Sequence, residues 1–250
     1  IIPKSKSRRA TCAIARGSDG FHTKQGQARG SLSLVGVGPG SREWRTAECV
    51  EILRSAEEIV GFKTYIHLIA DLNLRARFHP YPIGAETDRV HAALDLAAKG
   101  RDVALVCSGD AGIYAMAALA YEILDKSVRD DWQRIRLKVA PGISALQAAA
   151  ARVGAPLGHD FCTISLSDLL TPWSAIERRI RAAAEGDFVI AFYNPVSKRR
   201  RTQLPAARDI LLRTRQPSTP VVLAHDLGRS DERINVVTLE NLSVDDVDMT

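Results

Sequence analysis

Apolar residues follow two alternating patterns along most of the chain, short continuous runs and longer stretches with helical spacing. The run Leu32–Val37 is typical of a buried strand, and residues 89–99 place their apolar side chains on one face of a helix. The expected strands are 32–37, 58–61, 103–107, 137–139, 161–166, 188–193, 221–225 and 235–238. The expected helices are 43–56, 89–99, 113–124, 144–153, 175–184 and 203–214. Strands that alternate with helices indicate an α/β class with mostly parallel sheets.

The pattern divides the chain into three parts. Residues 1–31 are rich in Gly, Ser, Lys and Arg and lack sustained periodicity, which indicates a basic tail or linker and a candidate remnant of a fused domain. Residues 32–145 and 146–250 each contain strands and helices, so we expect two α/β domains. Ligands of such folds bind outside the carboxyl ends of the strands, here in a cleft between the domains.

Composition narrows the class of protein only slightly. Apolar residues make up 46% and charged residues 25% of the chain, which are ordinary globular values. No apolar run in the sequence is long enough to span a bilayer, and the basic start is not followed by the apolar stretch of a signal peptide. The default prediction is a cytoplasmic protein without a membrane partner.

Cysteines and charges give a second set of expectations. Cys12, Cys49, Cys107 and Cys162 form no CxxC pair, so we predict incidental or buried thiols and no metal site. The net charge of +5 favours acidic partners, either nucleic acid or a small molecule with carboxylates or phosphates. The run Lys198–Arg201 is either a solvated face or a carboxylate-binding group.

A glycine-rich turn, Gly36–Gly40, follows the first strand. Glycine lets a backbone approach a ligand closely, and a helix expected to begin near Arg42 would direct its dipole at the turn. The spacing departs from GxGxxG, and a tight structural turn is an equally good interpretation.

Two more glycine turns end later strands of the same half. In Ser108–Gly112, the residue Asp110 either contacts a ligand or caps the helix expected at 113–124. In Ala140–Ala145, the simplest role of Ser144 is an ordinary helix N-cap. Because parallel strands bring their carboxyl ends to one edge of the sheet, we expect the three turns to line one pocket.

A fourth strand-end turn lies in the second half. Phe192–Pro195 combines an aromatic residue and an amide, and Lys198–Arg201 follows it closely. Arginine binds carboxylates in a bidentate manner, so this segment suits a flat ring that carries carboxylates.

Several motifs in this order resemble the tetrapyrrole methylases. They are VGVGPG (35–40), SGDAGIYAMA (108–117), APGISALQAAAARVGAPLGHDFCTISLSD (140–168) and FYNP (192–195). The segments GFKTY (61–65), GAETDR (84–89) and HDLGRSDE (225–232) are most similar to the subgroup that methylates C17 of precorrin-3B. The resemblance covers residues 32–250.

The resemblance implies a fold and a cofactor. The family has two α/β domains with S-adenosylmethionine in the cleft between them, released as S-adenosylhomocysteine, and is usually homodimeric. Many of the cofactor contacts carried over by motif would act through the backbone. The implied contacts are Pro39, Ser108, Gly109, Asp110, Ile113, Ser144, Ala145, Tyr193, Asn194 and Gly228.

The resemblance also implies a reaction, C17 methylation of precorrin-3B with ring contraction to precorrin-4 in cobalamin biosynthesis. The partner would be this acidic tetrapyrrole, not a nucleic acid. A general acid or base would assist the contraction, and the candidates are Asp110, Glu86, Lys63 and Tyr65. Glu86 and Lys63 also suit plain surface charges. Alternatives are a methylase with another acceptor (another precorrin or ribosomal RNA), a non-catalytic tetrapyrrole carrier, and an oxidoreductase, which the broken glycine spacing disfavours.

Overall fold

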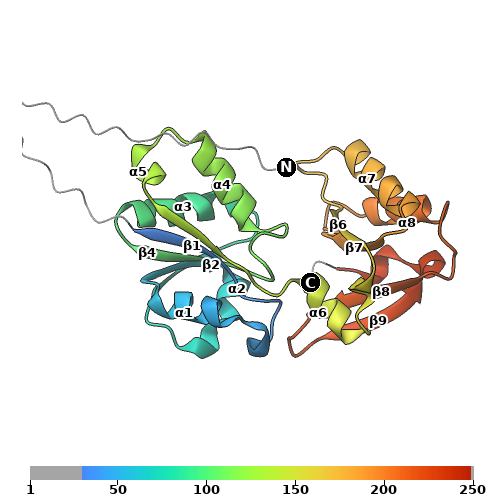
Figure 1. Cartoon of the computed structure of the whole chain (residues 1–250), viewed down its shortest axis with the longest axis horizontal. Coiled ribbons are helices and arrows are strands. Elements are labelled where there is room, and N and C mark those ends of the chain that lie inside the picture. The colour runs from blue at the N-terminus through green and yellow to red at the C-terminus, as the bar shows by residue number, and fades with distance from the viewer. Residues whose placement is uncertain (1–29, 249–250) are drawn as a thin grey trace, which may run out of the picture.

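The first half of the chain forms a five-stranded parallel sheet in a computed structural model that describes residues 30–248 (Figure 1). The strands are β1 (Ser31–Gly36), β2 (Glu58–Phe62), β3 (Arg77–Tyr81), β4 (Asp102–Cys107) and β5 (Arg136–Ala140). Their order is β3-β2-β4-β1-β5, and every neighbouring pair is parallel. The prediction of an α/β class with a mostly parallel sheet is confirmed for this half.

Helices cover both faces of this sheet (Figure 1). One face carries α1 (Ala47–Ser55) and α2 (Lys63–His67), and the other carries α3 (Glu86–Ala98), α4 (Met116–Lys126) and α5 (Asp130–Gln133). Successive side chains of a strand point to opposite faces, so Leu34 packs in the cluster with α3 and α4 while Val35 packs in the cluster with α1. Burial on both faces explains why β1 is a continuous apolar run.

The second half contains two short sheets and three helices. The strands are β6 (Phe161–Ser165), β7 (Val189–Tyr193), β8 (Pro220–His225) and β9 (Arg233–Thr238), and the helices are α6 (Ala145–Arg152), α7 (Trp173–Glu185) and α8 (Gln203–Leu211). Strands β6 and β7 are parallel, and β8 and β9 form a separate pair. Ile164, Ile176, Ile180 and Leu204 belong to the core that α7 and α8 share with the strands.

Not every pairing in the second half is parallel. Strands β8 and β9 are antiparallel, with Val222 opposite Val236. The link 226–232 between them is too short for the crossover that parallel neighbours need, so the chain turns back as a hairpin. The predicted strands 221–225 and 235–238, which had no helix between them, therefore form an antiparallel pair in a fold whose other strand pairs are parallel.

Two helices begin later than the apolar spacing predicts. A separate 3-10 turn occupies Arg42–Trp44, and α1 begins at Ala47, capped by the Thr46 hydroxyl that accepts the N–H of Cys49. Helix α4 begins at Met116, and no side chain caps it. The predicted helix starts at 43 and 113 are therefore wrong, and of the two interpretations of Asp110 the structure contradicts the helix cap.

The sequence also missed two elements at the edge of the first sheet. Strand β3 alternates exposed and half-buried residues and includes Pro80, so it lacks the apolar run of an inner strand. Helix α2 has five residues, too few to show a helical period. Proline at 80 is tolerated because edge strands leave one row of N–H groups without a strand partner.

The predicted domain boundaries can be compared with the structure only in part. Of the predicted tail, residues 1–29 lie outside the described residues, and Ser31 already belongs to β1. The predicted border between residues 145 and 146 falls in the first turn of α6 and stays a prediction. Within residues 30–248, no helix has both the length and the apolar character needed to cross a bilayer.

Candidate functional site

The carboxyl ends of β1 and β4 form a topological switch point in the first sheet. The two strands are neighbours, but the chain leaves β1 toward α1 on one face and leaves β4 toward α4 on the other (Figure 1). Connections that diverge in this way mark the position at which parallel α/β sheets bind ligands. The turns 36–40 and 108–112 border this position.

Backbone groups of three turns interlock at this edge. Gly38 donates its N–H to the carbonyl of Gly109 (3.1 Å), and Gly109 donates its N–H to the carbonyl of Gly38 (2.8 Å). A Cβ on Gly36 would lie 2.6 Å from the carbonyl oxygen of Gly109 and 2.8 Å from the amide nitrogen of Gly142. Such approaches leave no room for a side chain at residue 36. The three glycine turns are therefore neighbours, as the strand-end argument predicts.

Asp110 ties two of these turns together through its carboxylate. Oδ1 accepts the N–H of Gly112 (2.7 Å), and Oδ2 accepts the N–H of Gly142 (3.0 Å). Both oxygens are thus engaged by backbone amides of the site. The other predicted contacts of this turn are Ser108 and Ile113, both half-buried.

Ser144 begins α6 beside the glycine turns. Its buried hydroxyl accepts the N–H of Gln147, and the Gln147 side chain accepts the N–H of Ser144 in a capping box. The interpretation of Ser144 as a helix N-cap is confirmed. Ala145, also a predicted cofactor contact, is exposed at the first residue of the helix.

Two tyrosines join this edge to the second half of the chain. Tyr193, the last residue of β7, accepts the N–H of Leu146 on its phenol oxygen (3.3 Å). Tyr114 donates its hydroxyl to the carbonyl of Thr163 (2.9 Å), and the two tyrosine ring centroids are 5.1 Å apart. Burial raises the pKa of Tyr193, whereas Tyr114 remains 50% exposed. The pair offers a flat ligand an aromatic surface beside the glycine turns.

Asn194 follows Tyr193 and adopts a left-handed conformation, with φ of 51°. Its side chain donates to the hydroxyl of Ser165 (3.1 Å), and its carbonyl accepts from the Arg200 guanidinium (2.9 Å). Arg200 is buried, whereas Lys198 and Arg199 are exposed. Lys198 and Arg199 are therefore consistent with a solvated face, Arg200 supports the turn instead, and carboxylate binding by this run stays a prediction.

Gly228 brings a further turn of the second half against the first glycine turn. The side chain of Arg229 donates to the carbonyl of Pro39 (3.3 Å). Gly228 has φ of 74°, and a Cβ on it would lie 2.5 Å from the amide nitrogen of Ser41. Pro39 and Gly228, both predicted cofactor contacts, therefore lie side by side although most of the chain separates them.

The other acid–base candidates lie at the same edge of the sheet, beyond β2 and β3. Lys63 begins α2 and is exposed. Tyr65 packs edge-on against Phe62 with ring centroids 5.1 Å apart, and burial raises the pKa of its phenol. Glu86 begins α3 and accepts a hydrogen bond from the buried guanidinium of Arg89 (2.7 Å). Tyr65 and Glu86 are therefore held by neighbours, whereas Lys63 faces solvent.

The described thiols show no sign of reactivity. Burial raises the pKa of Cys49 and of Cys107 to about 11, and it also raises the pKa of the half-buried Cys162. Thiols of this kind are inert because the thiolate is the reactive form. Cys12 lies outside the described residues. Across residues 30–248, no group of three or more His, Cys, Asp or Glu side chains is arranged to hold a metal ion.

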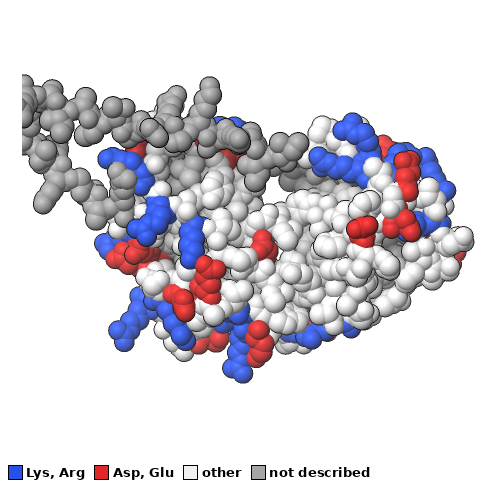
Figure 2. Space-filling view, in the orientation of Figure 1, with Lys and Arg blue, Asp and Glu red and all other residues white. Residues whose placement is uncertain are grey.

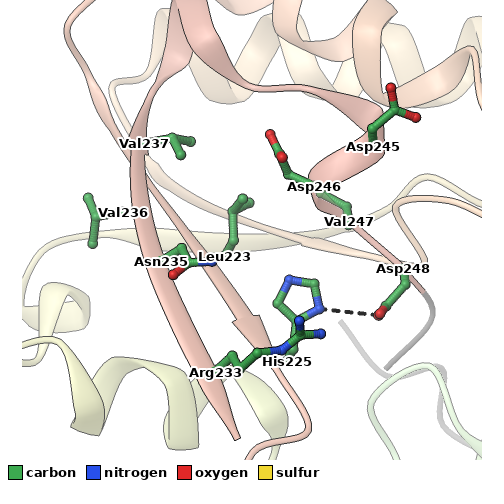
Figure 3. A pocket seen from close by; sticks show the side chains of 10 residues that line it. All are labelled: Leu223, His225, Arg233, Asn235, Val236, Val237, Asp245, Asp246, Val247 and Asp248. Carbon is green, nitrogen blue, oxygen red and sulfur yellow. Dashed lines mark hydrogen bonds and ion pairs between the residues drawn. The ribbon is translucent and has the colours of Figure 1, made fainter. Parts of the chain in front are cut away.

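A hollow of about 560 Å³ lies on the β8–β9 hairpin (Figure 3). Two of its lining residues, His225 and Asp248, point toward each other, with Nδ1 and Oδ1 3.2 Å apart. Its lining is Leu223, His225, Arg233, Asn235, Val236, Val237 and Asp245–Asp248. None of the predicted cofactor contacts lines this hollow, so the cofactor prediction concerns the strand-end edge alone.

Surface charge does not single out a nucleic-acid face. On the face shown in Figure 2, blue and red side chains are interspersed at the two outer ends of the molecule, and the middle is mainly uncharged. A nucleic-acid surface presents a patch or stripe of one sign. The net charge of +5 is therefore not gathered into one basic patch on this face.

Four residues around the site were not predicted as site residues from the sequence. Tyr114, Arg152 and Glu232 lie inside recognised motifs but were not singled out, and Trp44 gave no signal of its own. Arg152 donates to Glu232 (2.8 Å) and its guanidinium stacks on the Trp44 ring (4.6 Å to the centroid). Contacts between residues so distant in the chain leave no local pattern to detect.

Comparisons with known proteins agree with the motif resemblance. A family model described as tetrapyrrole (corrin/porphyrin) methylases matches residues 31–243. A probable cobalt-factor III C(17)-methyltransferase of Salmonella typhimurium is 46% identical over 88% of this chain and 89% of that protein. A precorrin-3B C(17)-methyltransferase of Sinorhizobium sp is 45% identical over 88% of this chain and 86% of that protein. A cobalt-factor III methyltransferase of Priestia megaterium is 43% identical over 86% of this chain, but only 40% of that longer protein is covered.

Solved structures show the same fold. The crystal structure of the methyltransferase CobJ has a TM-score of 0.82 at 39% identity, covering 88% of this chain and 91% of that one. A Thermus thermophilus uroporphyrin-III C-methyltransferase complexed with S-adenosylhomocysteine has a TM-score of 0.66 at 20% identity, covering 88% of each chain. The second likeness supports the fold alone.

Proposed function

Because the chain belongs to the tetrapyrrole methylase family, we propose that it transfers a methyl group from S-adenosylmethionine to C17 of precorrin-3B, with ring contraction to precorrin-4 in cobalamin biosynthesis. The observation that carries this proposal is the interlock of three glycine turns at the β1–β4 switch point, in a chain 45% identical to a precorrin-3B C(17)-methyltransferase. A backbone-lined edge of this kind suits a donor that must approach the main chain closely.

The residues at the switch point fit the methyl donor. S-adenosylmethionine supplies a methyl group on a positively charged sulfur and leaves as S-adenosylhomocysteine when that methyl–sulfur bond breaks. Gly109 has φ of 65° and presents bare backbone toward the start of α6. Tyr114 and Tyr193 supply an aromatic wall next to it. Their task is to hold the donor so that sulfur, methyl and acceptor carbon lie in line, which excludes unproductive geometries and water.

We assign Asp110 to this positioning task. Its two oxygens accept the N–H groups of Gly112 and Gly142, so the carboxylate fixes the shape of the donor edge. A base whose oxygens both hold backbone amides is poorly placed to take a substrate proton. This leaves the acid–base step to residues beyond β2 and β3.

Tyr65 and Glu86 are the best-placed acid–base candidates. During contraction, the hydroxyl on the meso carbon loses its proton and one of the two bonds from that carbon to the macrocycle breaks, its electron pair forming the direct bond that closes the smaller ring, so that the meso carbon becomes the carbonyl of an acetyl group. The raised pKa of Tyr65 keeps its phenol protonated at neutral pH, so it serves as a hydrogen-bond donor to the substrate. Glu86 is partly exposed at the start of α3 and is the candidate proton acceptor. Lys63 faces solvent, where it suits a substrate carboxylate.

The test is methyl transfer from labelled S-adenosylmethionine to precorrin-3B, with cobalt-factor III as a parallel acceptor because relatives carry both substrate names. We expect one labelled methyl group per product with precorrin-3B. Calorimetry with S-adenosylhomocysteine shows beforehand whether the protein is folded and binds the donor product. A protein that binds it yet labels neither acceptor would overturn the proposed substrate, and labelling of cobalt-factor III alone would replace it.

We also propose that the protein is a homodimer in the cytoplasm. The hairpin supports self-association, since Val222 and Val236 are opposite each other and expose 36% and 61% of their surface. Exposed β-branched residues on a strand pair favour contact with another apolar surface. Light scattering after size exclusion should give twice the mass of 27.3 kDa, and a monomer at micromolar concentration would contradict it.

A further inference from the structure

One guanidinium links the two halves of the molecule at the proposed donor edge. The guanidinium of Arg152, the last residue of α6, lies over the ring of Trp44, with 4.6 Å between the guanidinium carbon and the ring centroid. Its Nε donates to Oε1 of Glu232 at 2.8 Å. Trp44 belongs to the turn after β1, and Glu232 belongs to the link between β8 and β9. Arg152 therefore holds together two segments that lie far apart in the chain.

The carboxylate of Glu232 that contacts Arg152 also contacts Gly228. Its second carboxylate oxygen accepts the N–H of Gly228 at 2.6 Å. Gly228 in turn lies against the first glycine turn, because a Cβ on it would come within 2.5 Å of the Ser41 amide nitrogen and 3.0 Å of the Trp44 ring. The four groups form a closed ring of contacts from Arg152 to Glu232, Gly228, Trp44 and back to Arg152.

Helix α6 connects this ring to the opposite side of the donor edge. The helix begins at the capping box of Ser144 and ends at Arg152. Its first turn is also held by Tyr193, which accepts the N–H of Leu146. A short helix fixed at both ends transmits the position of its last residue to its first. The placement of Ser144 beside Gly109 therefore depends on what Arg152 holds.

We propose that Arg152 is a positioning residue for the methyl donor, acting by holding the Gly228 turn and the Trp44 turn together around Pro39. The proposal rests on the proposed function, because it requires the donor to occupy this edge. Arg152 is not a catalytic residue, since it acts through Glu232 and Trp44. Each single contact is weak at a solvent-exposed site, but the four contacts form one closed ring.

The chain offers a matched control on the far side of the first sheet. Arg129 stacks on Trp132 at 4.2 Å and pairs with Asp95 at 2.7 Å and Asp131 at 2.6 Å. This cluster reproduces the stacked guanidinium and its carboxylates, but it joins α3 to α5 and touches no glycine turn. Arg129→Ala therefore removes the same kind of interaction without reaching the donor edge.

The experiment compares Arg152→Ala, Arg152→Lys and Arg129→Ala. We expect Arg152→Ala to weaken S-adenosylhomocysteine binding and to raise the KM for S-adenosylmethionine by roughly five- to tenfold. Its kcat and its KM for the tetrapyrrole should stay within about twofold. Arg152→Lys keeps the charge beside Glu232 but loses the planar stack, so it should recover about half of the loss on a logarithmic scale.

The outcomes separate this proposal from the proposed function. Unchanged donor affinity in a folded Arg152→Ala overturns the positioning role and leaves the methyltransferase intact. An equal loss of donor affinity in Arg129→Ala also overturns it, because the effect would then reflect general stability. A wild-type protein that binds no S-adenosylhomocysteine overturns both. If Arg152→Ala fails to fold, Arg152→Lys and Glu232→Gln carry the same comparison.

Discussion

The two walls of the proposed donor edge are built in different ways. The wall from the first half is made of backbone: Gly36, Gly38, Gly109 and Gly142 approach one another so closely that no side chain fits at residue 36. Apart from the close backbone approach of Gly228 to Ser41, the wall from the second half is made of side chains, chiefly Tyr193 and those that surround Asn194. A backbone wall has one geometry, whereas a side-chain wall can adjust. We therefore expect substitutions in the first wall to cost more stability and more donor affinity than substitutions in the second.

The largest effect should come from Gly36→Ala. The new methyl group would lie 2.6 Å from a carbonyl oxygen and 2.8 Å from an amide nitrogen, both in backbone that cannot rotate away. We expect a loss of about 3 kcal/mol in the free energy of unfolding, measured by urea denaturation, and a loss of measurable S-adenosylhomocysteine binding. Gly158→Ala is the control, because a Cβ there meets no atom within 4 Å. If Gly36→Ala were as stable as Gly158→Ala, the backbone around residue 36 would have moved to accommodate the methyl group, which would contradict the prediction.

Asp110→Ala should come second. It removes the acceptor of two backbone N–H groups in the same wall, and each hydrogen bond to a charged group contributes about 1.5–3 kcal/mol. Neighbouring water can take part of that role, so we expect a net loss of about 2 kcal/mol together with weaker donor binding. If Asp110 were instead the general base, kcat would collapse while calorimetry showed unchanged S-adenosylhomocysteine affinity.

Tyr193→Phe probes the side-chain wall and should cost less. It keeps the ring beside Tyr114 and removes only the phenol oxygen that accepts the N–H of Leu146. We expect a loss of about 1 kcal/mol in thermal or urea unfolding and a modest rise in the KM for the donor. Tyr121→Phe, on the half-exposed ring of α4, gives the baseline for losing a surface hydroxyl. A Tyr193→Phe effect equal to that of Gly36→Ala would erase the contrast between the walls.

The sequence predicted the backbone wall better than the side-chain wall, for a physical reason. Parallel strands bring their carboxyl ends to one edge, so glycine turns after successive strands must meet there once the alternation of strand and helix is recognised. The convergence of Gly36, Gly109 and Gly142 followed from that rule. The family resemblance, which rests on residues in these same turns, was confirmed by the comparisons.

The rest depended on contacts that no local pattern encodes. Helix α4 begins at Met116 and not at 113, because Tyr114 adopts φ of 49° and turns its ring toward Tyr193. The β8–β9 pair is antiparallel because the link between the strands is short, a consequence that was not drawn from the predicted strands 221–225 and 235–238 although no helix was expected between them. Arg152 lies within the motif 140–168 but was not predicted to have a role, since that role arises only when α6 brings it between Trp44 and Glu232.

The smallest expected effect is the pH dependence of the Arg152–Glu232 contact in the side-chain wall. The Arg152 guanidinium and, secondarily, the N–H of Gly228 hold the pKa of Glu232 below its ordinary value of 4.5. A carboxyl whose pKa is lower in the folded state adds stability that is complete above 4.5 and is lost as the pH falls through the folded pKa. We therefore expect the free energy of unfolding of wild type to exceed that of Glu232→Gln by a small, constant amount around neutral pH. The two free energies should become equal as the pH falls below 4.5.

Glu57 provides a control that separates an effect on the stability of the fold from an effect on the donor edge. Its carboxylate likewise accepts from an arginine, Arg101 (2.8 Å), and from a backbone N–H, that of Asp102 (3.0 Å), and its pKa is also lowered. Glu57 precedes β2 at the end of the sheet opposite the glycine turns. Glu57→Gln should therefore show the same convergence below pH 4.5 in unfolding while leaving S-adenosylhomocysteine affinity unchanged at every pH. Glu232→Gln should lower that affinity at neutral pH, because glutamine has one acceptor oxygen for the two donors, Arg152 and the N–H of Gly228, that the carboxylate accepts from. Equal donor affinities in the two variants would mean that the side-chain wall stabilises the fold without shaping the site.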